Sequence, residues 1–177
     1  MSTHNAICGL YSASPVKAIK YGPGSVSYLI ELIKLVSENP DALQKALIIT
    51  GKSLATKTPV VKQVEDLLKA EGMYGDTFFG IGQHAPIQGI RDGVQIVKDK
   101  KITVLIGLGG GSPIDAAKAI SYFTQQETGG TFVPQVAIPT TLSAAEFIMS
   151  AGFTSEQGHK TGVASPAVIP KVWMRPC

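Results

Sequence analysis

The sequence predicts an α/β fold, in which a Rossmann-like parallel sheet carries helices on both faces. Short runs of apolar and β-branched residues alternate with segments of about 10 to 15 residues whose apolar positions recur at helical spacing. Strands that alternate with helices form right-handed βαβ units, and the resulting sheet is covered on both sides. A run of three glycines directly after a strongly apolar run is the second observation, because such loops join a strand to a helix in these folds.

The first half of the chain contains two helix patterns between three strand patterns. We expect strands at 16–21, 45–50 and 76–81, and helices at 26–38 and 58–72. Thr58 is expected to cap the second of these helices, and Gly72 is expected to end it. The first helix is expected from four apolar residues at helical spacing, namely Leu29, Leu32, Ile33 and Val36.

The second half continues the alternation and then breaks it. We expect helices at 86–100 and 112–125, the former weakened by Gly89 and Gly93, and strands at 102–108 and 135–141. After Ala144 the helical spacing is lost. The apolar runs 147–154 and 167–174 are typical of further strands, and we expect them as an antiparallel pair at the edge of the sheet. No long linker or repeat divides the chain, so residues 1–177 are predicted to form a single domain.

The composition excludes several classes of protein. The net charge is +3 and the charges are dispersed, so no nucleic-acid partner is expected. No apolar run is long enough to span a membrane, and no signal peptide is expected at the start. Cys8 and Cys177 have neither the spacing of a metal site nor that of a disulfide framework. We therefore expect a cytoplasmic protein.

The glycine run has the features of an anion-binding turn. Gly109, Gly110 and Gly111 lack a Cβ and allow another group to approach the backbone closely. Ser112 is expected as the N-cap of the next helix, with Asp115 completing a capping box. A helix N-terminus at the carboxyl end of a parallel strand suits a diphosphate. The alternative is a tight turn without a ligand, since neither the complete Rossmann fingerprint nor a Walker loop is present.

Two segments of the chain resemble a known family. The run "GGGSPIDAAKAI" at 109–120, followed by "IPTT" at 138–141, is similar to the iron-containing alcohol dehydrogenase family. The runs "PTTLSAAEF" at 139–147 and "GHKTGV" at 158–163 look most like its maleylacetate reductase branch. The resemblance implies that this chain matches the family's N-terminal domain, which binds NAD or NADP.

The resemblance also implies roles for individual residues. Gly109 to Ser112 match the loop that holds the diphosphate, and Asp115 and Lys118 match positions on the following helix. Thr140 and Thr141 match residues beside the adenine and ribose. Lys160 matches a lysine on the ribose and phosphate side of the cofactor. Purely structural roles stay open for all of these: capping, an exposed ion pair, strand formation or a surface charge.

The turn after the second expected strand favours NADP over NAD. Family members that prefer NAD often carry an acidic residue there, which binds the ribose 2′-hydroxyl. Here the turn contains Gly51, Lys52 and Ser53, which would accept a 2′-phosphate where a carboxylate would repel it. NAD remains an alternative, and so does a plain turn with an exposed lysine.

The family's metal site is not expected in this chain. In the family an aspartate and three histidines of a second, helical domain bind the metal, and those ligands would lie beyond the last residue here. His4, His84 and His159 have no partner at ligand spacing, so we expect no metal. Arg175 stands where the family has an acidic residue, and "LSAAE" replaces the family's glycine-rich "GTGSE".

Three functions remain open from the sequence. The first is an NADPH-dependent reductase, or the remnant of one, in which Lys160, His159 or Tyr122 polarises a carbonyl. The second is a repurposed enzyme that catalyses proton transfer, dehydration or cyclisation on a small organic substrate, with Glu146, His159 or Asp115 as acid or base. The third is a non-catalytic module, or half of a split dehydrogenase.

A partner is expected in each case. An isolated cofactor domain exposes apolar surface that a second domain would cover, and we expect a homo-oligomer or a partner chain there. The segments 147–153 and 167–174 are the candidates for this surface, and the alternative is that they close the core.

Overall fold

The computed structural model describes residues 9–11 and 16–175, so His4, Cys8 and Cys177 lie outside the described part. Its main sheet has seven strands in the order β1-β2-β9-β6-β5-β3-β4. β1 pairs with β2 in antiparallel fashion, and all other neighbours are parallel. The strands are β1 (Gly9–Tyr11), β2 (Ala18–Tyr21), β3 (Ala46–Thr50), β4 (Tyr74–Phe78), β5 (Val104–Gly109), β6 (Gln135–Pro139) and β9 (Val172–Arg175).

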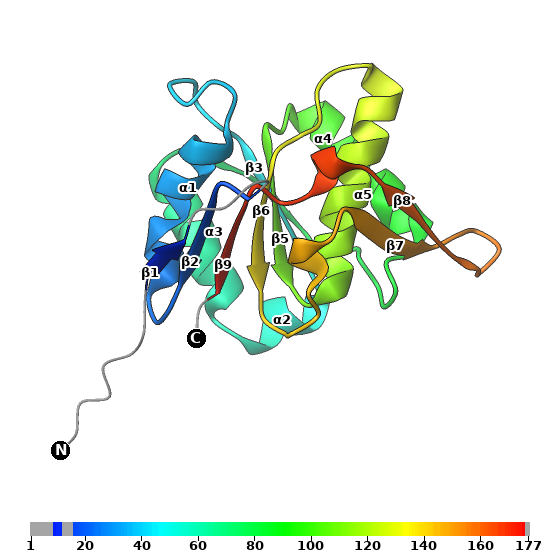
Figure 1. Ribbon diagram of the computed structural model, residues 1–177, viewed down its shortest axis with the longest axis horizontal. Coiled ribbons are helices and arrows are strands. Elements are labelled where there is room, and N and C mark those ends of the chain that lie inside the picture. Colours follow the sequence, from blue (N-terminus) through cyan, green and yellow to red (C-terminus); the bar gives the residue numbers. More distant parts are fainter. Residues whose placement is uncertain (1–8, 12–15, 176–177) are drawn as a thin grey trace.

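Helices cover both faces of this sheet, which confirms the expected fold class (Figure 1). α1 (Leu29–Val36) and α3 (Val60–Ala70) lie on one face, and α4 (Ile87–Lys100) and α5 (Gly111–Thr128) lie on the other. The short helix α2 (Lys52–Lys57) directly follows β3. None of the described helices has the length and hydrophobicity needed to cross a membrane.

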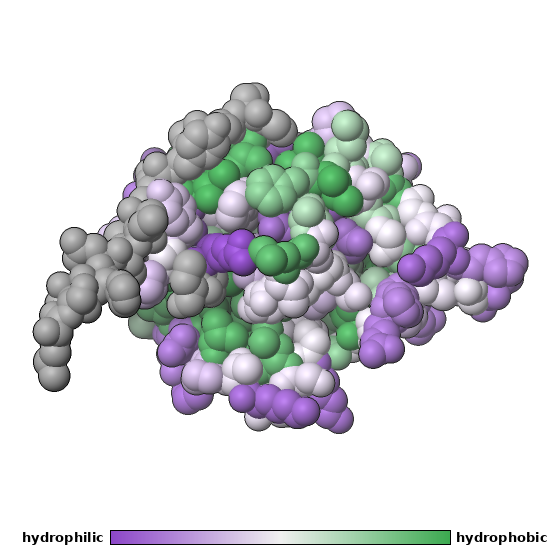
Figure 2. Space-filling model, turned by 60° about the horizontal axis from the view of Figure 1, so that its bottom comes forward, coloured by the Kyte–Doolittle hydropathy of each residue, from purple (hydrophilic) through white to green (hydrophobic). Residues whose placement is uncertain are grey.

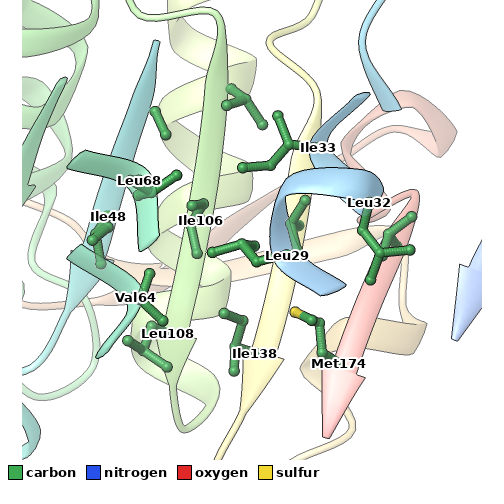
Figure 3. Packing of buried hydrophobic residues seen from close by; sticks show 14 of the residues in the cluster. Leu29, Leu32, Ile33, Ile48, Val64, Leu68, Ile106, Leu108, Ile138 and Met174 are labelled. Atoms are coloured by element: carbon green, nitrogen blue, oxygen red, sulfur yellow. The ribbon is translucent and has the colours of Figure 1, made fainter. Parts of the chain in front are cut away.

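Alternate residues of the central strands supply the two halves of the core. Ile48 of β3 points toward α1 and α3, whereas its neighbours Leu47 and Ile49 face α4 and α5. All three are fully buried, as expected for a parallel strand that is covered on both sides. In Figure 3, side chains of α1 and α3 meet those of four strands; the labelled residues are Leu29, Leu32, Ile33, Ile48, Val64, Leu68, Ile106, Leu108, Ile138 and Met174.

The strands near the C-terminus are present, but their expected pairing was wrong. β7 (Ser150–Thr154) pairs with β8 (Lys160–Ala164) in an antiparallel hairpin outside the main sheet. β9 instead enters the main sheet between β2 and β6, parallel to both. The physical reason is burial: Val172 and Met174 need the protected interior of the sheet, whereas β8 is polar and exposed and suits a surface hairpin.

Two expected helix starts also need correction. α5 begins at Gly111 with Gly110 as its N-cap, so Ser112 lies inside the first turn and Asp115 completes no capping box. Thr58 does not cap α3 but ends α2, where its hydroxyl donates a hydrogen bond to the Leu54 carbonyl at 2.8 Å. The expected stop at Gly72 is confirmed, since this residue has a φ of 67° just beyond the end of α3.

The glycine at the centre of α4 is explained by helix packing. A Cβ on Gly93 would lie 2.9 Å from Cγ1 of Ile120 on α5, and closer still to the Cδ1 of that side chain. Gly93 thus weakens the helix locally but lets α4 and α5 pack closely.

Candidate functional site

Three strands end side by side at one edge of the sheet. Thr50 at the end of β3 pairs with Leu108 of β5, and Gly109 of β5 pairs with Pro139 of β6. In Figure 1, the arrowheads of β5 and β6 point toward the end of the molecule that carries α2. The segments expected to bind a cofactor, at 51–53, 109–112 and 140–141, therefore meet at one edge.

The glycine loop is held closely against the segment that follows β6. Gly109 has a φ of 141°, which strongly favours glycine, and its carbonyl accepts a hydrogen bond from the Thr140 N–H at 2.8 Å. A Cβ on Gly110 would lie 3.3 Å from Oγ1 of Thr141, and a Cβ on Gly111 would lie 3.3 Å from Cβ of Ser143. Gly110 and Gly111 are partly exposed, so their backbone can be reached within a narrow space, whereas Gly109 is buried.

The N-terminus of α5 fits an anion. The helix has 18 residues, and no side chain forms a cap hydrogen bond at Gly110. The first amides of an α-helix have no partner within the helix, and its dipole adds partial positive charge at this end. A glycine cradle beside uncapped amides is the arrangement that binds a phosphate or diphosphate.

A cavity of about 290 Å³ lies beside this helix N-terminus. Helix α5 supplies Gly111, Ser112 and Asp115, and the β7–β8 hairpin supplies Gly152, Phe153, Lys160 and Thr161. His84, Ser143, Ala145 and Ile148 complete the lining. The structure thus brings four residues singled out in the sequence (Gly111, Ser112, Asp115 and Lys160) to one pocket.

Lys118 lies beneath this pocket and does not line it. Its side chain is 0% exposed, and its Nζ donates to the Ser150 carbonyl at 2.8 Å and to Oδ1 of Asp115 at 3.2 Å. Burial lowers the pKa of Lys118, while the charges of Asp115 and Glu146 act in the opposite direction. Lys118 therefore contacts Asp115 and Ser150 and not the pocket, and the cofactor contact expected of it stays a prediction.

Of the expected catalytic residues, Lys160 and Asp115 line the pocket, whereas Glu146, His159 and Tyr122 do not. Glu146 is buried outside the lining, and its Oε2 has no hydrogen-bond partner. His159 is exposed in the turn of the hairpin, where its backbone N–H donates to Oγ of Ser155 at 3.2 Å. Tyr122 lies further along α5, with its ring against Phe123 and Phe132.

His84 is a pocket residue that the sequence did not reveal. It has a φ of 61°, and Ala85 has a φ of 46°, both unusual for residues other than glycine. Thr154 of β7 holds this turn, because its hydroxyl donates to the His84 carbonyl at 3.2 Å and its N–H donates to the Ala85 carbonyl at 3.2 Å. His84 and Thr154 are 70 residues apart, so no local sequence pattern indicates that they meet at the pocket.

The turn at Gly51 is open to solvent beside the glycine loop. No atom lies within 4 Å of a Cβ built on Gly51, and Lys52 and Ser53 are exposed in the first turn of α2. Leu54 of the same helix lies 3.8 Å from the Cβ position of Gly109. Space and positive charge are therefore available next to the candidate diphosphate site.

Within residues 9–11 and 16–175, no group of three or more His, Cys, Asp or Glu side chains is placed to hold a metal ion. The described residues thus do not fit a metal centre, and the expectation of a metal-independent chain stays a prediction.

Residues 16–174 match the family model of iron-containing alcohol dehydrogenases. The chain belongs to the iron-containing alcohol dehydrogenase family. Lactaldehyde reductase of Escherichia coli (strain K12) is 30% identical over 167 residues, which cover 86% of this chain and 42% of that protein. An NADPH-dependent aldehyde reductase of the same strain is 35% identical over 103 residues, or 58% of this chain and 24% of that protein.

Solved structures of the family share the fold. Maleylacetate reductase from Rhizobium sp. strain MTP-10005 superposes with a TM-score of 0.74 at 25% identity, covering 93% of this chain and 42% of that one. The family expected from the glycine run is thereby confirmed, and its maleylacetate reductases are among the similar structures. The chain spans less than half the length of these relatives.

Proposed function

We propose that this chain is the NADP-binding part of an oxidoreductase that reduces a small carbonyl substrate. The observation that carries the proposal is the uncapped N-terminus of α5, which emerges from a glycine cradle and borders a polar pocket. The relatives are alcohol and aldehyde oxidoreductases, which supports an oxidoreductase-like cofactor domain.

The positions of the residues suggest how the cofactor would lie. The diphosphate would bind the amides of Gly109 to Ser112, with the adenosine toward Thr140 and Thr141. The nicotinamide end would enter the pocket that Asp115 and Lys160 line. When bound, the cofactor supplies the hydride, while these side chains bind and orient it.

We propose NADP rather than NAD because of the open turn at Gly51. A 2′-phosphate there would meet the exposed Lys52 and Ser53 and no carboxylate. The similarity to an NADPH-dependent aldehyde reductase supports the same choice.

The other functions considered from the sequence receive less support. Of the three acid or base groups considered for a non-redox reaction, only Asp115 lines the pocket, whereas Glu146 and His159 lie outside it. Carbonyl polarisation by Lys160, which lines the pocket, or by a residue of a partner is part of our proposal. We also propose that a second copy or a partner chain covers the pocket, and that the protein is cytoplasmic.

The proposal is tested by titrating the protein with NADPH and NADH, followed by calorimetry. We expect saturable binding of NADPH and at least about tenfold weaker binding of NADH, equivalent to about 1.4 kcal/mol. Absence of binding for both nucleotides would refute the proposed function.

The diphosphate site is tested by Gly110→Val. The branched side chain would collide with Thr141 and cover the helix amides, so we expect NADPH affinity to fall by at least about tenfold. Gly110→Ala is the matched control, because φ is −81° and the added Cβ meets Thr141 at 3.3 Å, a tight but tolerable contact. Unchanged affinity in the valine variant, with its fold intact, would contradict the diphosphate role.

A further inference from the structure

We propose that Lys118 is a positioning residue for the cofactor pocket, fastening the β7–β8 hairpin to α5 and orienting the Asp115 carboxylate toward the bound nucleotide. The inference rests on the proposed function, because the nucleotide is what the pocket would hold.

The two walls of the pocket belong to elements that no sheet joins. Asp115 and Ser112 come from α5, whereas Lys160 and Thr161 come from the hairpin, which is separate from the main sheet. The width of the pocket therefore depends on how the hairpin is attached to α5.

Polar contacts between α5 and β7 are made by Lys118 and its ion-pair partner Asp115. Lys118 donates to the Ser150 carbonyl at the first residue of β7, at 2.8 Å. It also donates to Oδ1 of Asp115 at 3.2 Å, while Oδ2 of Asp115 accepts the Gly152 N–H at 3.3 Å. Lys118 and Asp115 together thus hold two backbone groups of β7 against the helix.

The same contacts orient the carboxylate. Each Asp115 oxygen accepts one hydrogen bond from the protein, and the side chain remains 21% exposed where it lines the pocket. Each carboxylate oxygen has a second lone pair, so an oriented Asp115 can accept a hydrogen bond from a ribose hydroxyl or an amide of the ligand. Lys118 itself does not line the pocket, because its side chain is fully buried.

Burial of Lys118 disfavours its charged form, and the carboxylate of Asp115 opposes this effect. Glu146, 5% exposed and with an unpartnered Oε2, adds a second negative charge near the ammonium. Exchange of a buried ion pair for apolar side chains often leaves stability unchanged or raises it. A contribution to global stability therefore does not explain why a lysine lies at position 118, whereas a role in holding the walls of the pocket does.

The test compares two ligands in the variant Lys118→Met. Adenosine 2′,5′-bisphosphate reports on the 2′-phosphate end of the site, and NADPH also fills the pocket. We expect the variant to bind NADPH about tenfold more weakly and the bisphosphate within about twofold of the original protein. Lys118→Arg should restore part of the NADPH affinity. Lys62→Met, which removes a 76% exposed lysine of α3, is the matched control and should change neither ligand.

Amide hydrogen exchange without a ligand separates the two proposals. In Lys118→Met we expect faster exchange at Gly152 and Thr154, with the central strands unchanged. If the original protein binds no NADPH but this acceleration occurs, the proposed function fails and the fastening role of Lys118 stands. Unchanged exchange, or an equal loss of both ligands, would overturn the positioning role. If Lys118→Met does not fold, Asp115→Asn replaces it, because asparagine keeps the shape of the side chain. This variant must show faster amide exchange at Gly152 and Thr154, and it must lose affinity for NADPH but not for the bisphosphate.

Discussion

In the proposed nucleotide site, the expected preference for NADP over NAD depends on the absence of a side chain at Gly51. Gly51 is the N-cap of α2, with φ and ψ of −87° and 143°, and no side chain caps the helix. Aspartate prefers this position and conformation, and nothing lies within 4 Å of the place its Cβ would take. A carboxylate can therefore be introduced without disturbing the fold.

We expect Gly51→Asp to stabilise the protein slightly while reversing its nucleotide preference. A capping carboxylate gains a few tenths of a kcal/mol over glycine, and the same charge repels a 2′-phosphate. NADPH affinity should fall by about tenfold and NADH affinity should rise, as measured by calorimetric titration. Gly51→Asn has the same shape without the charge and should retain NADPH. Equal losses in both variants would show that shape, not charge, decides the preference.

At the scale of elements, a carboxylate ties the edge strand β4 to the helix that covers it. Glu65 of α3 accepts hydrogen bonds from the Thr77 hydroxyl at 2.7 Å and from Nζ of Lys69 at 3.0 Å. Tyr74 extends the network through a 3.0 Å contact between its hydroxyl and that of Thr77. Partial burial raises the pKa of Glu65, but these hydrogen bonds outweigh it, so the net pKa lies below the ordinary value.

The sign of this shift predicts how Glu65→Gln changes stability with pH. A lowered pKa in the folded state means that the carboxylate stabilises the fold above its unfolded pKa, and that this contribution is lost as pH falls through the folded pKa. We expect the variant to be less stable by about 0.5–1 kcal/mol at pH 7, because Lys69 is half exposed and screened. Urea unfolding between pH 7 and pH 3 should show the difference shrinking; a difference independent of pH would contradict this account.

At the scale of the whole molecule, the order of elements was predictable and their neighbours were less so. Alternating strands and helices appear in the local spacing of apolar residues, so most ranges agree with the structure to within a few residues. The place of β9 between β2 and β6 was not predictable, because strand order depends on contacts between distant segments. The N-cap of α5 is Gly110 and not the expected Ser112 for a similar reason, since the distant residues Thr141 and Ser143 pack against the glycine loop.

The candidate site was predictable only where one segment carries it. The glycine run predicts a phosphate cradle, with a tight turn without a ligand as the alternative, whereas the pocket forms from segments that are far apart in the chain. His84 reaches it through a left-handed turn tied to Thr154, and no local pattern indicates such a turn. The burial of Lys118 likewise depends on Ser150, which lies 32 residues away in the sequence.

One surface of the molecule carries apolar side chains that nothing in the described chain covers. Between β6 and β7, four residues form what we call the 142–149 patch: Leu142 is 80% exposed, and Phe147, Ile148 and Met149 are each about half exposed. Ile148 also lines the pocket. The Phe147 ring packs edge-on against Trp173, with 4.8 Å between the ring centroids. Figure 2, which brings the bottom of Figure 1 forward, shows hydrophobic areas on this side of the molecule. A patch that borders a binding pocket is typical of an interaction surface.

We expect this patch to make the isolated chain self-associate. The double variant Leu142→Ser, Met149→Ser removes apolar area of which at least half is exposed, so its melting temperature should stay within about 2 °C of the original. Light scattering after size exclusion should give masses above 18.6 kDa for the original chain and close to that value for the variant. Tyr28→Ser, which removes an exposed aromatic ring on the α1 side of the sheet, is the control and should not change the mass. A single-chain mass for the original protein at all concentrations would leave the patch to a different partner chain and rule out the second copy.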